Sequence, residues 1–157
     1  MCQPQKTYTL TEAKKKLERY CAYQERCHQE VRNKLVAMRM IPEAIDHIMV
    51  HLIGEGYLNE ERFTQNFVLG KFRQKQWGRL RLRQELKRRK IGDKLIGEAL
   101  QQIEEEYETV FEALVQKRLA QLKGEKDKYR KRKKLADYLA YRGWEGEMIY
   151  EILVECI

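Results

Sequence analysis

The sequence predicts an all-α protein made of three tandem three-helix repeats, stacked into an elongated, curved array. Three observations favour this fold class. The same apolar positions recur three times along the 157 residues. Charged residues make up 36% of the chain, a high share that is typical of repeats with much solvated helix surface. Only two prolines occur, too few for the turns of a strand-rich fold.

The repeat is visible when Leu35, Leu86 and Leu139 are superimposed, at periods of 51 and then 53 residues. Five further columns are apolar in all three copies, which indicates internal repetition. These columns are Val31, Leu82 and Leu135; Met40, Ile91 and Trp144; Ile45, Ile96 and Ile149; Ile48, Ala99 and Ile152; and Met49, Leu100 and Leu153.

The first helix of each repeat is predicted over residues 10–22, 59–76 and 106–122. Thr9 and Glu12 form a capping-box pattern at the start of the first of these helices. Asn59, a residue type that commonly caps helices, begins the second.

The second and third helices of each repeat carry the apolar columns, whose spacings of three and four lie on one helix face. Pro42, Gly92 and residues 143–146 mark the corners between them. Residues 79–83 alternate as a strand would. We predict helix there because Leu82 and Leu86 occupy repeat columns.

The domain limits that follow are a flexible N-terminal segment and three repeats. A unit of about 45–50 residues buries little apolar area alone, so the repeats are expected to stabilise one another by stacking. The segment covers residues 1–12, and the repeats cover residues 13–58, 59–105 and 106–157.

Catalytic and cofactor sites are not expected. His47 and His51 are four residues apart, but no third ligand or catalytic glutamate accompanies them. The glutamates of residues 104–108 form a consecutive run that faces several directions, unlike a catalytic pair. The four cysteines lack paired metal-ligand spacing, so reduced thiols are expected. An unseen enzyme site, such as that of a nuclease, is therefore the weakest hypothesis.

A cytoplasmic protein with no membrane association is expected. No apolar run approaches the roughly 18 residues of a membrane helix. The N-terminus does not lead into the apolar core of a signal peptide.

The net charge of +8 is unevenly distributed. Residues 71–90 hold ten Lys or Arg and one acid, and residues 117–134 hold ten and two. The rest of the chain is net acidic, with 12 basic and 21 acidic residues. This polarity favours a partner that offers phosphates or acidic side chains.

The candidate partner-binding residues come from these two basic segments. Arg79, Arg83 and Lys87 fall within about 80° on a helical wheel, and Arg132 and Lys134 recur near the same positions of the third repeat. The full candidate set is Arg73, Lys75, Trp77, Arg79, Arg81, Arg83, Lys87, Arg88, Arg130, Lys131, Arg132, Lys133 and Lys134.

Four short motifs occur in a specific order. They are Gly56-Tyr-Leu-Asn-Glu-Glu-Arg-Phe63, Arg83-Gln-Glu-Leu86 after a basic stretch begun by Gly78, Arg89-Lys-Ile91, and Tyr138-Leu-Ala-Tyr-Arg-Gly-Trp144. Over about residues 20–157 the chain resembles the RecX regulatory family, bacterial modulators of the RecA recombinase.

The chain departs from the family pattern at three places. Asn59 and Glu60 replace the usual acid pair, which preserves a helix cap. Arg89-Lys90 replaces the usual Lys-Gly, and the corner at residues 39–42 also lacks glycine. We expect these two corners to lose their left-handed glycine.

The resemblance implies a regulator that binds RecA filaments on single-stranded DNA. It would inhibit or modulate the recombinase, ATPase and coprotease activities in homologous recombination, DNA repair and the SOS response. It implies no enzyme activity and no cofactor, and a monomer is expected. The alternative is a stand-alone helical repeat protein that binds single-stranded or duplex nucleic acid with the same basic residues.

Overall fold

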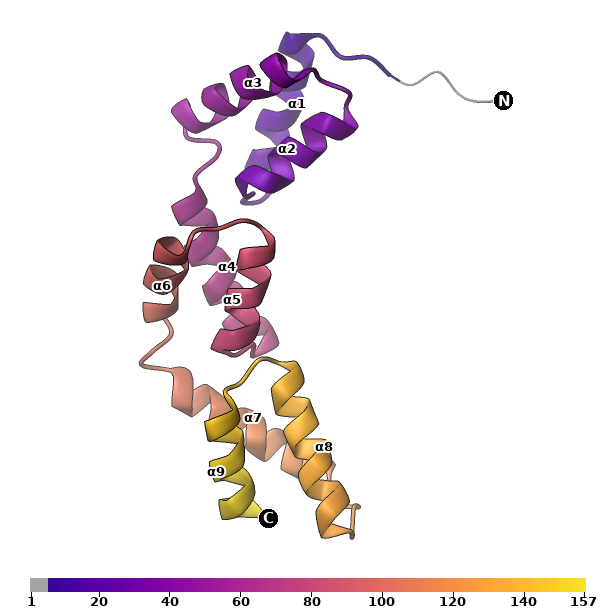
Figure 1. The fold of residues 1–157 in the computed structure, drawn as a ribbon, viewed down its shortest axis with the longest axis vertical. Helices are drawn as coiled ribbons and strands as arrows, with labels where there is room; N and C mark the ends of the chain where they lie inside the picture. The colour runs from indigo at the N-terminus through magenta and orange to yellow at the C-terminus, as the bar shows by residue number, and fades with distance from the viewer. Residues whose placement is uncertain (1–5) are drawn as a thin grey trace, which may run out of the picture. The chain divides into compact units, whose positions relative to one another are not determined.

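A computed structural model describes residues 6–157, where nine α-helices alternate with short connections and no strand occurs (Figure 1). The all-α prediction is confirmed, as is the helix over residues 79–83. The helices are α1 Leu10–Tyr23, α2 His28–Ala37, α3 Pro42–Gly54, α4 Glu60–Lys75, α5 Arg79–Arg88, α6 Asp93–Gln101, α7 Tyr107–Gln121, α8 Lys128–Tyr141 and α9 Gly146–Cys156.

Helix α1 begins where the capping box predicts. The Thr9 hydroxyl accepts a hydrogen bond from the Glu12 amide, and the Glu12 carboxylate accepts one from the Thr9 amide, each at 3.1 Å. Of the N-terminal segment predicted to be flexible, residues 1–5 lie outside the described residues. Residues 10–12 belong to α1.

The chain divides into two compact units. The first comprises residues up to Asn66 together with Arg89–Ile91, and the second comprises Phe67–Arg88 and Gly92–Ile157. Residues 59–105, the second predicted repeat, therefore contribute to both units. The candidate residues 73–88 and 130–134 all lie in the second unit.

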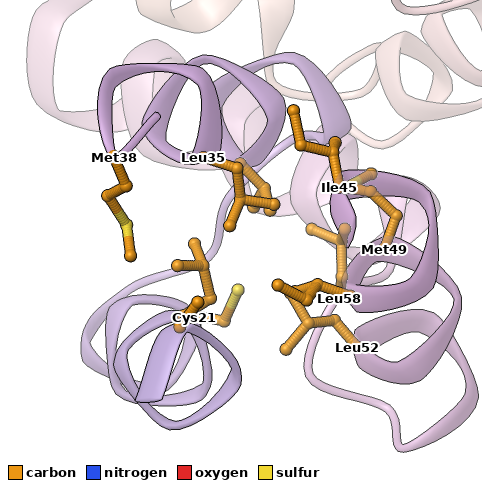
Figure 2. Close-up of a cluster of buried hydrophobic side chains, with 11 residues drawn as sticks. Cys21, Leu35, Met38, Ile45, Met49, Leu52 and Leu58 are labelled. Carbon is orange, nitrogen blue, oxygen red and sulfur yellow. The ribbon is translucent and has the colours of Figure 1, made fainter. Parts of the chain in front are cut away.

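The core of the first unit is aliphatic. Cys21 from α1, Leu35 from α2 and Met49 from α3 point toward one another in Figure 2. Ala13 and Leu17 precede Cys21 at intervals of four, so one face of α1 is buried throughout. Burial of the Cys21 thiol raises its pKa to about 11, so this cysteine is a packing residue.

The core of the second unit contains an aromatic cluster. Phe72, Tyr107 and Trp144 are fully buried, and Phe111 is nearly so. The ring centroids of Tyr107 and Trp144 are 4.5 Å apart, and those of Phe111 and Trp144 are 5.1 Å apart. Because these residues come from α4, α7 and the corner before α9, the cluster joins the second and third repeats.

The apolar columns of the repeat form the cores, as predicted. All their residues are buried except Met40, Ile152 and Leu153, which are half-buried. The corners between the second and third helices of each repeat are also found where Pro42, Gly92 and residues 143–146 predict them.

Replacing Leu86 by alanine should lower the free energy of unfolding by roughly 2–5 kcal/mol, because its side chain is fully buried. Leu80→Ala is the matched control on the same helix, where the side chain is 54% exposed and the expected change is about 0.5 kcal/mol or less. Chemical denaturation of both variants measures the difference. Equal losses would place Leu86 outside the core.

The left-handed conformation persists at the corners that lack glycine. The φ angles are +61° at Arg39, +60° at Lys90 and +87° at Gly143, the equivalent position in each repeat. At the third corner the Trp144 amide donates to the Leu139 carbonyl at 3.2 Å, a typical helix ending. The first two corners lack glycine, as expected, but they keep the left-handed conformation. This conformation costs about 1–2 kcal/mol at each non-glycine residue.

The Gly56–Phe63 motif builds the corner between α3 and α4. Gly56 has a φ of +79°, and its carbonyl accepts a hydrogen bond from the Arg62 guanidinium at 3.0 Å. The Asn59 side chain accepts a hydrogen bond from the Arg62 amide at 2.9 Å, which confirms the predicted helix cap. Leu58 is buried, so the motif contributes to the core as well as to this corner.

Candidate partner-binding surface

The connection between α4 and α5 contacts the corner between α8 and α9 through backbone hydrogen bonds. The Gly78 amide donates to the Arg142 carbonyl at 2.7 Å, and the Leu80 amide donates to the Gly143 carbonyl at 3.0 Å. Trp144 Nε1 donates to the Gln76 carbonyl at 3.0 Å. We call residues 76–80 and 142–145 the glycine junction.

Both glycines of the junction are required by close approach of the two segments. A Cβ atom on Gly78 would lie 2.5 Å from the Gly143 carbonyl oxygen. A Cβ atom on Gly143 would collide with the backbone nitrogen and Cβ of Arg81, and Gly143 also has a left-handed φ. The sequence signal for this contact is a glycine beside a tryptophan in both segments, which sequence reasoning did not use.

Arg79 is built into the glycine junction. Its guanidinium lies 3.0 Å from the Glu145 carboxylate and 3.8 Å from the centre of the Tyr107 ring. The Tyr107 hydroxyl donates to Glu145 and accepts a hydrogen bond from the Arg79 amide at 2.9 Å. Burial, followed by the neighbouring Glu145 carboxylate, raises the pKa of Tyr107 strongly, so the hydroxyl keeps its proton.

Arg81 is held between two aromatic rings. Its guanidinium carbon lies 4.2 Å from the centre of the Trp77 ring and 4.7 Å from that of Tyr141. Its Nη1 donates to the Tyr141 carbonyl at 3.1 Å. The rings of Trp77 and Phe67 pack edge to face, with centroids 6.2 Å apart. Trp77, Arg79 and Arg81, all predicted to bind a partner, thus make contacts within the protein.

Arg79→Gln should lower the stability of the second unit by about 1–2 kcal/mol. The change removes a charge-assisted hydrogen bond to Glu145 and the contact with the Tyr107 ring. Arg83→Gln, one turn along α5, is the matched control and should change stability by about 0.5 kcal/mol or less. Urea denaturation compares them, and an unchanged midpoint for Arg79→Gln would contradict its structural role.

The other candidate residues of the first basic segment are exposed or half-buried. Arg73, Lys75, Lys87 and Arg88 are exposed, and Arg83 is half-buried. Their ion pairs are long: 3.4 Å for Arg73 with Glu106, 3.5 Å for Lys87 with Asp93, and 3.7 Å for Arg88 with Glu85. We call Arg73, Lys75, Arg83, Lys87 and Arg88 the α5 basic area.

The candidate residues of the second basic segment occupy the first two turns of α8. Arg130, Lys133 and Lys134 are exposed, and Lys131 is half-buried. Lys134 pairs with Glu125 at 2.7 Å. Arg132 is directed differently, because its Nη2 donates to the Leu153 carbonyl at 3.5 Å. We call Arg130, Lys131, Lys133 and Lys134 the α8 basic area.

The α8 basic area lies away from the contact between α5 and α8. The start of α5 contacts Tyr141, the last residue of α8, whereas the α8 basic area ends at Lys134. Seven residues of helix separate these positions, which is about 10 Å along the axis. The candidate set therefore divides into residues that contact other parts of the second unit and the two basic areas. The former residues are Trp77, Arg79, Arg81 and Arg132.

Exposed cations of this kind can contact anions without reorganising the fold. Ion pairs between solvent-exposed side chains contribute only about 0–1 kcal/mol, so a partner can replace them at little cost. Phosphates and carboxylates are the groups that such areas would bind.

Residues 6–157 contain no group of three or more His, Cys, Asp or Glu side chains that could hold a metal ion. His47 is exposed, and His51 lies 3.9 Å from the Glu18 carboxylate. Glu104, Glu105 and Glu106 are exposed to solvent. In the same part of the chain, no helix combines the length and the apolar character needed to cross a bilayer.

Comparison with known proteins finds matches over most of the chain. Residues 59–100 match the family model for the second three-helix domain of RecX, and residues 104–153 match that for the third. A regulatory protein RecX from Prosthecochloris aestuarii is 30% identical over 138 residues, which are 88% of this chain and 89% of the relative. One from Chlorobium phaeobacteroides is 32% identical over 129 residues, or 82% and 83% of the two chains. The crystal structure of RecX from Lactobacillus salivarius has a TM-score of 0.78 at 21% identity, covers 93% of this chain and 95% of that chain, and therefore shares its fold.

Proposed function

Because the chain belongs to the RecX family of regulatory proteins, we propose that it binds RecA filaments on single-stranded DNA and inhibits their recombinase, ATPase and coprotease activities. The observation that carries this proposal is the match to regulatory RecX proteins over 88% of the chain. The protein would act in the cytoplasm as a monomer, in homologous recombination, DNA repair and the SOS response. It would act by binding alone, without a cofactor or a reaction of its own.

The two basic areas support an electrostatic contact with the filament. Their cations are exposed or half-buried, and the ion pairs of the α5 basic area are long, so these cations can meet acidic side chains of RecA or phosphates of its DNA. The α5 and α8 basic areas lie on different stretches of the second unit. They are therefore two independently testable contact regions.

The direct test measures ATP hydrolysis by RecA on single-stranded DNA while this protein is added. We expect inhibition at substoichiometric or near-stoichiometric amounts, and no ATP hydrolysis by this protein alone. A RecA rate that stays unchanged at saturating protein would refute the proposal.

Charge reversals assign the contact region. Lys75→Glu with Lys87→Glu tests the α5 basic area, and Arg130→Glu with Lys133→Glu tests the α8 basic area. If an area contacts the filament, its variant should require at least about tenfold more protein for half-inhibition of the RecA ATPase, because like charges would face an anionic partner.

The matched control for charge is Lys15→Glu with Arg19→Glu, two exposed cations of α1. Each double variant lowers the net charge from +8 by four units. The control should inhibit RecA as the parent does. If all three variants inhibit equally, both basic areas are only solvated surfaces.

The second candidate function is nucleic-acid binding without RecA, favoured by the net charge of +8 and the two basic areas. It predicts binding to bare DNA that weakens steeply with salt and no effect on RecA. For single strands, the slope of log K against log salt should fall by about 0.7 for each phosphate contact removed. Charge reversal in the area that binds would make the slope shallower.

A further inference from the structure

Tyr141, the last residue of α8, presents an aromatic ring to solvent beside positive charge. The residue is 72% exposed. The Arg81 guanidinium carbon lies 4.7 Å from the centre of the Tyr141 ring. One side of the ring therefore contacts Arg81, while most of the residue remains accessible to solvent. The contacts with Arg81 hold Tyr141 in place.

The Tyr141 ring belongs to an ordered stack. Trp77, Arg81 and Tyr141 alternate aromatic, cation and aromatic groups, with 4.2 Å and 4.7 Å between the guanidinium carbon and the two ring centres. The stack is fixed by the hydrogen bond from Arg81 Nη1 to the Tyr141 carbonyl. The glycine junction fixes the next residue, since the Arg142 carbonyl accepts from the Gly78 amide. A preordered ring loses little conformational entropy on binding a flat ligand.

Positive charge accompanies the stack. Within residues 6–157, Arg81 contacts two rings and a carbonyl oxygen, groups that carry no net charge. A guanidinium has five N–H donors, so Arg81 retains donors besides the one used by the Tyr141 carbonyl. Lys71 adds a second cation, with its Nζ 5.4 Å from the Trp77 ring centre.

We propose that the Tyr141 ring is a stacking platform for an unpaired base of single-stranded DNA, and that Arg81 contacts the adjoining phosphate. An aromatic face with a neighbouring cation is the combination that single-stranded nucleic acid requires. Bases of a duplex are already stacked and paired, so the platform discriminates in favour of single strands. This inference rests on the proposed function, because the RecA filament that the protein would bind contains single-stranded DNA.

The test uses the full chain and two labelled probes, an oligothymidylate and a duplex of the same length, in fluorescence anisotropy. Tyr141→Ala should weaken oligothymidylate binding by roughly 5-fold to 150-fold, the range for loss of one stacked base. Tyr141→Phe keeps the ring and should bind as the parent does. Tyr150→Ala is the matched control, a 69% exposed tyrosine on α9 that should have no effect.

Salt dependence and the duplex separate stacking from charge. Tyr141→Ala removes a ring and no cation, so the slope of log K against log salt should stay unchanged. Duplex binding should also stay unchanged. Equal weakening for both probes, or a parent that does not bind oligothymidylate, overturns the platform. The unfolding curve of Tyr141→Ala is the control for folding. If it matches that of the parent, a loss of binding is due to the missing ring.

Parallel assays of RecA ATPase distinguish this inference from the proposed function. If Tyr141→Ala binds oligothymidylate normally but no longer inhibits RecA, the ring contacts protein, and the platform is wrong while the proposed function stands. If the parent shows ring-dependent oligothymidylate binding but no inhibition of RecA, the platform stands and the proposed function fails.

Discussion

Gly143→Ala is expected to destabilise the second unit by about 3 kcal/mol or more. The added methyl group would collide with the backbone nitrogen and Cβ of Arg81, and the φ of +87° would be strained for alanine. Each effect alone costs on the order of 1–3 kcal/mol. Relief of the collision would require the glycine junction to separate, which would break the hydrogen bonds of Gly78 and Leu80.

Tryptophan fluorescence measures this effect selectively. Both tryptophans, Trp77 and Trp144, lie in the second unit, so their emission during urea denaturation follows that unit. Gly97→Ala is the matched control in α6, where no atom lies within 4 Å of the added methyl group. It should raise stability by about 0.5–1 kcal/mol, because alanine favours helix over glycine. A Gly143→Ala midpoint equal to that of the parent would contradict the close approach.

Trp144→Ala should lower the stability of the second unit by about 3–5 kcal/mol. The side chain is fully buried and contacts the rings of Tyr107 and Phe111. The change also removes the hydrogen bond from Nε1 to the Gln76 carbonyl, which leaves that carbonyl without this donor.

Trp144→Phe separates packing from hydrogen bonding. It keeps an aromatic ring in the cluster but cannot donate to Gln76, so we expect a loss between those of the parent and Trp144→Ala. Trp77 remains as the fluorescent probe in both variants. If Trp144→Ala unfolds within about 1 kcal/mol of the parent, the aromatic cluster does not hold the second and third repeats together.

The helical fold could be predicted because its signal is local. Spacings of three and four place residues such as Leu82 and Leu86 on one face, and both are fully buried. Residues 79–83 alternate as a strand would, but the repeat columns predict the helix that is found there. Asn59 was likewise recognisable as a cap from residue type and position.

The division of the basic residues could not be predicted in the same way. A helical wheel places Arg79 and Arg83 on one side of α5, but it contains no information about Glu145 and Tyr141, which lie about 60 residues later and contact Arg79 and Arg81. Contacts over such sequence separations depend on how the repeats pack. The sequence therefore predicts a basic segment, but it does not distinguish the arginines that contact other parts of the second unit from the cations that are exposed.

The backbone conformation of the corners between the second and third helices also could not be predicted from residue type. Residue type predicts φ only as a preference, and glycine merely makes positive φ inexpensive. Arg39 and Lys90 adopt positive φ because the helices on either side must still turn and bury their apolar columns. Tertiary packing thus overrides the local preference of these two residues.

The glycine junction also has a consequence for the order in which the chain folds during synthesis. The core of the first unit uses residues between Ala13 and Leu58, so it can form while the later chain is still being made. The Gln76 carbonyl receives its hydrogen bond from a side chain 68 residues later. This hydrogen bond cannot form until Trp144 has been synthesised, and contacts of such separation slow the folding of the second unit relative to the first.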